Sequence, residues 1–187
     1  MKFILASKSP RRKELLSKIN INFDVIDSKI DESLISTNME ASHYCMLLAK
    51  LKASNVSQYY SEHTVIGADT IVVLNDRILN KPKNFNEAKD MLLSLSNNTH
   101  QVITGVAIRN QALNINKKFH EITYVKFYKL DDETLNYYIS KYEPYDKSGS
   151  YGIQDYASVF VKEINGSYDN VIGFPLSRFF NIIKEYI

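Results

Sequence analysis

Cysteine is almost absent from this chain of 187 residues, which contains only Cys45. A single cysteine excludes an internal disulfide framework and is typical of a protein in a reducing cytoplasm. Long apolar runs are absent too, since none approaches the ~20 residues needed to cross a bilayer. Residues 1–6 are too short for the apolar region of a signal peptide. We therefore expect a cytoplasmic protein with no membrane partner.

An excess of either charge is also missing, because the formal net charge is only +2. A protein that coats nucleic acid needs a strongly basic surface, so we expect no nucleic-acid partner and read any basic cluster as local. Hydrophobic residues make up 44% of the chain and charged residues 24%, which is usual for a globular protein. No repeat, linker or low-complexity segment divides the chain. Because this length can bury roughly 70% of the unfolded surface in one core, we expect a single domain over residues 1–187.

Three common catalytic signatures are missing as well. The chain lacks the glycine pattern ending in Gly-Lys-Ser/Thr that marks a P-loop. Its four histidines are not spaced as zinc ligands, and Cys45 has no evident catalytic triad. The chemistry must therefore come from other residue types.

The chain begins with an unusual combination of a short strand and a basic helix start. Residues 3–6 form an apolar run, and Ser9-Pro10 is typical of a helix cap followed by proline at the first helical position. Residues 11–13 then place two arginines and a lysine in the first turn, where the helix dipole favours anions. A bound phosphate would relieve this conflict, whereas the alternative is a solvated basic helix end.

A second anomaly is a lysine within the apolar face of a predicted helix over residues 39–60. The apolar positions of that face are Cys45, Leu48, Ala49, Ala53 and Val56. Lys52 lies among them, four residues from both Leu48 and Val56. Such a lysine either extends its amine to solvent or directs it toward a buried anion, and both alternatives remain open.

The third anomaly is an aspartate in the strongest predicted strand, residues 64–74. Asp69 follows two small residues, and a carboxylate in a buried strand is costly unless it is paired or binds a metal. We therefore favour a functional role for it. The strand continues through a predicted turn at Asn75-Asp76 into a hairpin over 71–79, which leads to Lys81. Pro82 holds that lysine in an extended conformation.

The remaining pattern predicts a mixture of strands and helices. Residues 143–154 form a long loop with two glycines and a proline, and such loops are usually functional in compact domains. The other expected strands are 23–26, 99–108, 119–128 and 159–164, and the other expected helices begin at Asn84 or Asn86, at Asp131 or Asp132, and at Pro175.

Eight polar residues stand in these unusual places: Ser7, Arg11, Arg12, Glu32, Lys52, Asp69, Lys81 and Gln154. Four of them are cations, which suits a polyphosphate ligand. Two are carboxylates, which suit Mg²⁺ or Mn²⁺. From the residues alone we infer a phosphate ligand together with a divalent metal, and no more specific chemistry.

Five segments resemble the Maf family of nucleoside triphosphate pyrophosphatases, in family order and spacing. They are Ala6–Leu16 (ASKSPRRKELL), Gly67–Thr70 (GADT), Lys81-Pro82, Asp146–Gln154 (DKSGSYGIQ) and Gly166–Pro175 (GSYDNVIGFP). Ser148 and Ser150 depart from this pattern, because alanine is common at both positions. The resemblance implies a mixed α/β fold, with an elongated mixed β-sheet flanked by helices around a central cleft, related to the inosine-triphosphate pyrophosphatases.

The resemblance also implies an activity, namely hydrolysis of a nucleoside triphosphate to its monophosphate and diphosphate. It assigns catalytic roles to Asp69, Lys52, Lys81 and Glu32, and a Mg²⁺ or Mn²⁺ ion to Glu32 and Asp69. Ser7, Arg12, Lys52 and Lys81 would bind and neutralise the phosphates. Whether Asp69 is the general base or only a metal ligand stays open, because a carboxylate on Mg²⁺ is a poor base. A homodimer is implied by the family alone.

Three positions of the resemblance bear on the substrate. Arg11, Thr70 and Gln154 match the branch that prefers dTTP and UTP, with modified pyrimidine triphosphates as further candidates. The branch that prefers 7-methyl-GTP has tryptophan, glutamine and glutamate there. The alternatives are a pyrophosphatase for other modified nucleotides and a regulatory nucleotide-binding protein acting on cell division.

Overall fold

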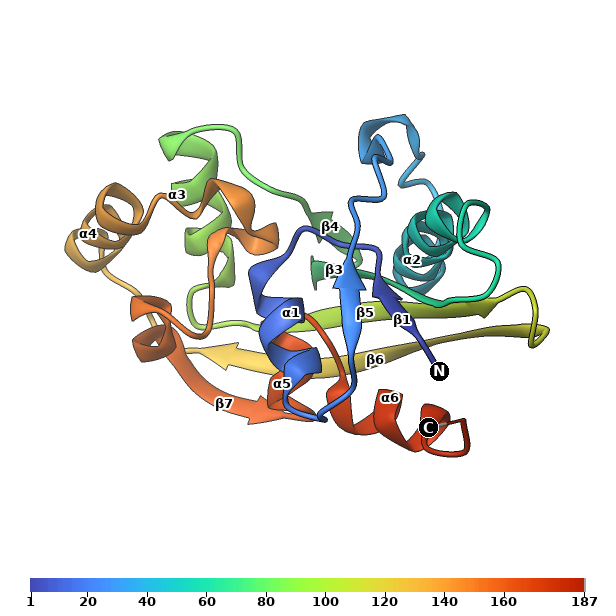
Figure 1. Ribbon diagram of the computed structural model, residues 1–187. Coiled ribbons are helices and arrows are strands. Elements are labelled where there is room, and N and C mark those ends of the chain that lie inside the picture. Colours follow the sequence, from blue (N-terminus) through green and yellow to red (C-terminus); the bar gives the residue numbers. More distant parts are fainter. Residues whose placement is uncertain (187) are drawn as a thin grey trace. The chain divides into compact units, whose positions relative to one another are not determined.

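Within residues 1–186, which the computed structural model describes, seven strands form one mixed sheet (Figure 1). The strand order is β2-β1-β3-β5-β6-β7, with β4 paired to β3. The strands β1 and β2 are parallel, as are β1 and β3, whereas β4 and β7 run antiparallel to β3 and β6. Their bounds are β1 Phe3–Leu5, β2 Phe23–Val25, β3 Thr64–Leu74, β4 Arg77–Leu79, β5 Thr99–Asn110, β6 Ile115–Phe127 and β7 Val161–Asn165.

Six α-helices are present in the same part of the chain: α1 Pro10–Ser17, α2 Ala41–Ser57, α3 Phe85–Leu95, α4 Asp132–Tyr142, α5 Tyr168–Ile172 and α6 Leu176–Ile183. Four short 3₁₀ turns accompany them: η1 Glu32–Leu34, η2 Pro144–Asp146, η3 Ser148–Ser150 and η4 Tyr156–Phe160. None of the helices in residues 1–186 is long and apolar enough to span a membrane. The mixed α/β fold class expected from the sequence is confirmed.

The chain forms two compact units, and each is described by itself. Unit 1 comprises residues 1–70, 104–121 and the chain from Gly173 on, whereas unit 2 comprises residues 71–103 and 122–172. The long strands β3, β5 and β6 each contribute residues to both units. The single domain over 1–187 and the central cleft stay predictions.

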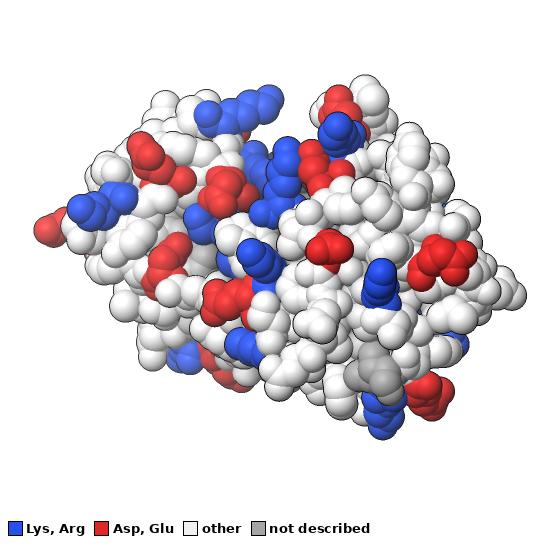
Figure 2. Space-filling model, in the orientation of Figure 1, with Lys and Arg blue, Asp and Glu red and all other residues white. Residues whose placement is uncertain are grey.

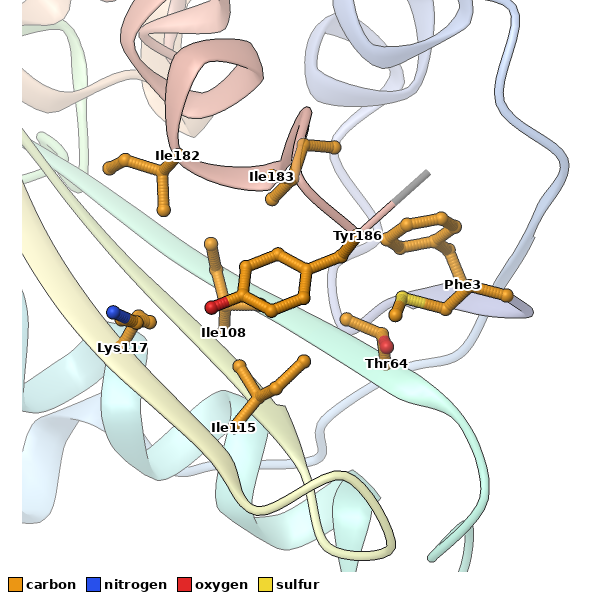
Figure 3. A pocket seen from close by; sticks show the side chains of 9 residues that line it. Phe3, Thr64, Ile108, Ile115, Lys117, Ile182, Ile183 and Tyr186 are labelled. Atoms are coloured by element: carbon orange, nitrogen blue, oxygen red, sulfur yellow. The ribbon is translucent and has the colours of Figure 1, made fainter.

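Unit 1 has helices on both faces of its part of the sheet, because successive strand residues point to opposite sides. One face packs against α2 through aliphatic side chains: Ile4, Ala6, Val65 and Ala107 from the strands, and Ala49, Ala53 and Val56 from the helix. The other face borders α6 around a small apolar pocket (Figure 3), whose lining includes Phe3, Thr64, Ile108, Ile115, Ile182, Ile183 and Tyr186.

Unit 2 is held together by large aromatic side chains. Phe127, Tyr138 and Phe160 are fully buried, and their rings meet at centroid distances of 5.1 to 5.9 Å. The helices α3 and α4 lie side by side over this core (Figure 1). Burial of such rings is a large share of the stability of a small core.

Local signals in the sequence explain most element boundaries. Ser9, Asn84 and Asp131 each accept a hydrogen bond from a backbone N–H of the helix that they cap. Asn75 and Asp76 both have positive φ, at 48° and 60°, as the predicted hairpin turn requires. These caps and this turn confirm the corresponding predictions.

Some predicted bounds differ from the structure, and some short elements were not predicted. The strand expected over 159–164 begins at Val161, because Val159 lies in η4. The five-residue helix α5 was not expected, since so short a segment has no measurable apolar period. The loop 143–154 contains two 3₁₀ turns, of which η2 begins at Pro144.

The surface charge is mixed. On the face drawn in Figure 2, lysine and arginine side chains lie among aspartate and glutamate side chains, in keeping with the net charge of +2.

Candidate active site

Arg12 makes three side-chain hydrogen bonds within unit 1. It occupies the third position of α1, and its side chain is turned inward so that only 9% of the residue is exposed. Its Nε donates to the Gly173 carbonyl at 2.9 Å, its Nη1 to Ser7 Oγ at 3.2 Å, and its Nη2 to Thr70 Oγ1 at 3.0 Å. A guanidinium has five N–H donors, so two more can serve a ligand. Arg11, the next residue toward the helix start, is partly exposed.

The electrostatic setting of Arg12 is that of a cation held for an anion. Burial lowers its pKa, while the nearby carboxylates of Asp69 and Glu32 oppose that shift. An arginine stays protonated under such conditions. The unit therefore keeps a buried positive charge at the start of α1, where the backbone N–H groups also favour an anion.

Lys52 joins the two predicted carboxylates. Its Nζ lies 2.6 Å from Asp69 Oδ1 and 2.6 Å from Glu32 Oε1, and the residue is only 7% exposed. Of the two alternatives for this lysine, the structure therefore has the buried anion rather than extension to solvent. Asp69 is buried in β3, whereas Glu32 opens η1 and is partly exposed.

This ion-pair cluster depends on a close approach of α2 to the sheet. A Cβ added to Gly67 in β3 would lie 2.2 Å from the Ala49 carbonyl oxygen, and one added to Gly105 in β5 would lie 2.6 Å from the Cys45 carbonyl oxygen. Both strands thus need glycine where the helix backbone touches them. The Cys45 thiol donates to the Asp69 carbonyl at 3.0 Å and accepts from the Gly105 N–H at 3.0 Å, and its burial raises its pKa well above the usual value.

The donor set at Lys52 fits a divalent metal in part. Glu32 and Asp69 supply carboxylate oxygens, the ligands that Mg²⁺ and Mn²⁺ prefer, and one oxygen of each lies 2.6 Å from the Lys52 ammonium. Within residues 1–186 no group of three or more His, Cys, Asp or Glu side chains could hold a metal ion. The two carboxylates could therefore hold such an ion only together with other oxygens, such as those of phosphate or water.

The other two predicted site residues belong to unit 2. Lys81 follows β4, and Gln154 is exposed after η3. Ser148 ties the two segments together, because its Oγ accepts from the Val72 N–H at 3.1 Å and donates to the Leu79 carbonyl at 2.5 Å. That Lys81 and Gln154 act on the same ligand as the residues of unit 1 stays a prediction.

Two groups that bond to the predicted site residues were not predicted from the sequence. Thr104 lies 3.0 Å from Thr70, hydroxyl to hydroxyl, and the Gly173 carbonyl accepts from both Thr70 and Arg12. A backbone carbonyl has no side-chain signature, so Gly173 could not be predicted. Thr104 could have been predicted, because it is a polar residue inside an apolar strand. The same signal identified Asp69.

Comparison with known proteins finds similar sequences and similar structures. A dTTP/UTP pyrophosphatase of Bacillus cereus strain AH187 is 48% identical over 185 residues, which cover 99% of this chain and 95% of that protein. One of Clostridioides difficile strain 630 is 44% identical, covering 100% and 95%. A HAM1 protein from Coxiella burnetii superposes with a TM-score of 0.48 at 14% identity, covering 68% of this chain and 73% of that one. A family profile described as Maf-like protein matches residues 2–186, and the chain therefore belongs to the Maf-like protein family.

Proposed function

We propose that this protein hydrolyses dTTP and UTP to the monophosphate and diphosphate. The names of relatives at 44–48% identity over nearly the whole chain support the substrate and the reaction. The observation that carries the proposal lies in β3, where two adjacent residues organise two clusters. Asp69 pairs with Lys52, and Thr70 bonds to Arg12. The side chains of Asp69 and Thr70 point to opposite faces of the sheet, so the carboxylate cluster and the Arg12 cluster flank the same point of β3. The charge of Asp69 still acts on Arg12 across that point.

The residues would divide the reaction between binding and proton transfer. Water attacks the α-phosphorus, and the bond from that phosphorus to the bridging oxygen breaks to release diphosphate. Ser7, Arg12 and Lys81 bind phosphate oxygens. Negative charge grows on the oxygens of the leaving diphosphate as the bond breaks, and these contacts stabilise it. In this proposal Asp69 either accepts the proton of the attacking water or holds the metal.

Lys52 gains a role beyond the one inferred from the sequence. Its two ion pairs hold Glu32 and Asp69 together, so it orders the carboxylates as well as facing a phosphate. Removing one member of a buried ion pair leaves the other uncompensated, which costs several kcal/mol, about 3–5. The lysine is therefore a positioning group for both carboxylates in this proposal.

A divalent cation, Mg²⁺ or Mn²⁺, is part of the proposal, with Glu32 and Asp69 as its protein ligands. When bound, it supplies positive charge that neutralises phosphate oxygens. A cytoplasmic location and a homodimer are proposed with it, on the grounds given by the sequence.

The preference for pyrimidines would come from Arg11, Thr70 and Gln154. The Thr70 hydroxyl is already engaged by Arg12, Thr104 and Gly173, so it orients Arg12 in addition to lining the ligand. Gln154 is exposed, and its amide offers one donor group and one acceptor. An imide edge such as that of uracil or thymine presents the complementary pair.

Identification of the products tests the proposal. The purified protein with Mg²⁺ or Mn²⁺ should release diphosphate and the monophosphate from dTTP and UTP. Release of inorganic phosphate instead would contradict it. Tight binding of the nucleotides without turnover would favour the regulatory nucleotide-binding alternative, and a preference for modified or purine triphosphates would favour the other.

A further inference from the structure

A buried polar pair in unit 2 lies outside the groups discussed so far. His100 of β5 is 1% exposed, and Tyr151, which directly follows η3, is 6% exposed. The His100 Nε2 atom lies 2.7 Å from the Tyr151 hydroxyl oxygen, a short hydrogen bond between residues 51 positions apart. This bond links the central sheet to the loop 143–154.

Aromatic packing fixes the orientation of both rings. Phe127 lies edge to face with each of them, at a centroid distance of 4.9 Å in both cases. The rings of His100 and Tyr151 are themselves nearly perpendicular, with centroids 5.4 Å apart. A hydrogen bond in such an apolar enclosure is strong, and its loss leaves a buried polar atom without a partner.

Burying a polar histidine ring at this position costs free energy. Its Nδ1 atom is buried and has no hydrogen-bond partner among the described residues, a condition that is rare for buried side-chain nitrogens. Packing alone would favour an apolar residue of similar size. Among the described residues, the polar contact of the His100 ring is therefore its hydrogen bond to Tyr151.

The bond anchors the segment that presents Gln154. Gly152 donates its N–H to the Tyr138 hydroxyl at 3.3 Å, and Ile153 is buried at 5% exposure. Tyr151 and Ile153 thus hold the segment against unit 2, while Gln154 is exposed.

The other end of the same segment is tied to the hairpin that leads to Lys81. Ser148 bonds to both strands of that hairpin, and Gly149 donates its N–H to the Asn80 carbonyl at 3.3 Å. Gly149 has φ of +69°, and a Cβ there would lie 2.9 Å from Val72. These ties leave residues 148–153 little freedom, and Tyr151 is held three residues before Gln154.

We propose that His100 and Tyr151 form a positioning pair that sets the direction of Gln154 and thereby the choice of nucleobase. This inference rests on the proposed function, because it assumes that Gln154 reads the base. The pair touches no substrate. It acts by keeping the Gln154 amide where its donor and acceptor meet the imide edge of uracil or thymine.

The variant Tyr151→Phe tests the proposal, because it removes only the hydroxyl. We expect the ratio of kcat/KM for UTP to that for GTP to fall about fivefold to thirtyfold, the effect of one misplaced hydrogen-bonding group. The loss should be mainly in KM for UTP, with kcat nearly retained. Tyr156→Phe is the matched control, since it removes a tyrosine hydroxyl from the stacked rings of the same unit, and it should leave the ratio unchanged.

A double-mutant cycle separates this role from a structural one. If Tyr151 acts through Gln154, then Tyr151→Phe should lower the ratio in the wild-type background but not in a Gln154→Ala background. An equal loss in both backgrounds would overturn the inference. His100→Gln, which can still reach the Tyr151 hydroxyl, should retain the preference, whereas His100→Leu should lose it as Tyr151→Phe does.

The cycle also distinguishes failure of this inference from failure of the proposed function. If the wild-type protein releases no diphosphate from UTP or dTTP, the proposed function is wrong. If Gln154→Ala leaves the ratio unchanged, the assignment of Gln154 is wrong and the positioning role falls with it. If Gln154→Ala lowers the ratio and Tyr151→Phe does not, only the positioning role is refuted. The fold of each variant is checked by its urea unfolding curve.

Discussion

The burial of His100 predicts a specific dependence of stability on pH. Burial lowers the pKa of His100 from 6.5 to about 3, and burial is the only cause. The folded state therefore disfavours the imidazolium, and the unfolded state binds the proton more tightly. The contribution to stability is complete above pH 6.5 and is lost as the pH falls through 6.5 toward 3.

The magnitude follows from the two pKa values. Between pH 8 and pH 5 the linkage relation gives a loss of about 2 kcal/mol in the free energy of unfolding for this one group. The slope approaches about 1.4 kcal/mol per pH unit near pH 5, which corresponds to one proton. For a chain of this size the loss should lower the melting temperature by about 4–8 °C.

Urea unfolding curves at pH 8 and pH 5 measure this loss, and His100→Gln supplies the comparison. Glutamine can bond to the Tyr151 hydroxyl but does not titrate, so the pH dependence of the variant should be smaller than that of the wild type by about 2 kcal/mol. All other ionisable groups are the same in the two proteins, so their contributions cancel in the difference. Equal pH dependence in the two proteins would refute the reasoning, because His100 would then have an ordinary pKa.

Three further predictions concern unit 1. Asp69→Asn should lower kcat by a factor on the order of 10³, and its urea unfolding curve should show that the variant is folded without urea. The matched control is Asp24→Asn, which changes an exposed carboxylate of β2. Wild-type turnover of Asp69→Asn would remove that residue from the mechanism. Gly67→Ala should lower the free energy of unfolding by about 3 kcal/mol, because its Cβ would lie 2.2 Å from the Ala49 carbonyl, and an unchanged unfolding curve would contradict that contact. Arg11→Trp should reduce the kcat/KM preference for dTTP over GTP, and an unaltered substrate profile would exclude Arg11 from base selection.

Elements with strong local signals were predictable. The helix α2 has a full apolar stripe, and the turn at Asn75-Asp76 has residues that tolerate positive φ, so both lie close to where the sequence placed them. The helix α5 and the start of β7 depend on packing within unit 2 instead. Their residues form no period long enough to distinguish a helix or strand from a loop.

Site residues were predictable where a charged residue stands at a position that otherwise favours an apolar one. Asp69 in a buried strand and Lys52 in an apolar stripe both signalled a partner, and each proved to be a partner of the other. The third bond of the Arg12 guanidinium goes to a carbonyl 161 positions away. Every residue has a backbone carbonyl, so the sequence does not mark residue 173 as the acceptor. Only the folded structure shows this contact.

The close approach of α2 to β3 and β5 has a consequence for changes made elsewhere on that helix. The backbone oxygens of Cys45 and Ala49, about one turn apart, abut two glycines, and Lys52 follows within the next turn. The position of the helix along its axis is thus set by main-chain contacts as well as by side-chain packing. Its outward residues, such as His43 and Lys50, can be exchanged for labels, tags or surface attachments without shifting the ammonium from its carboxylates.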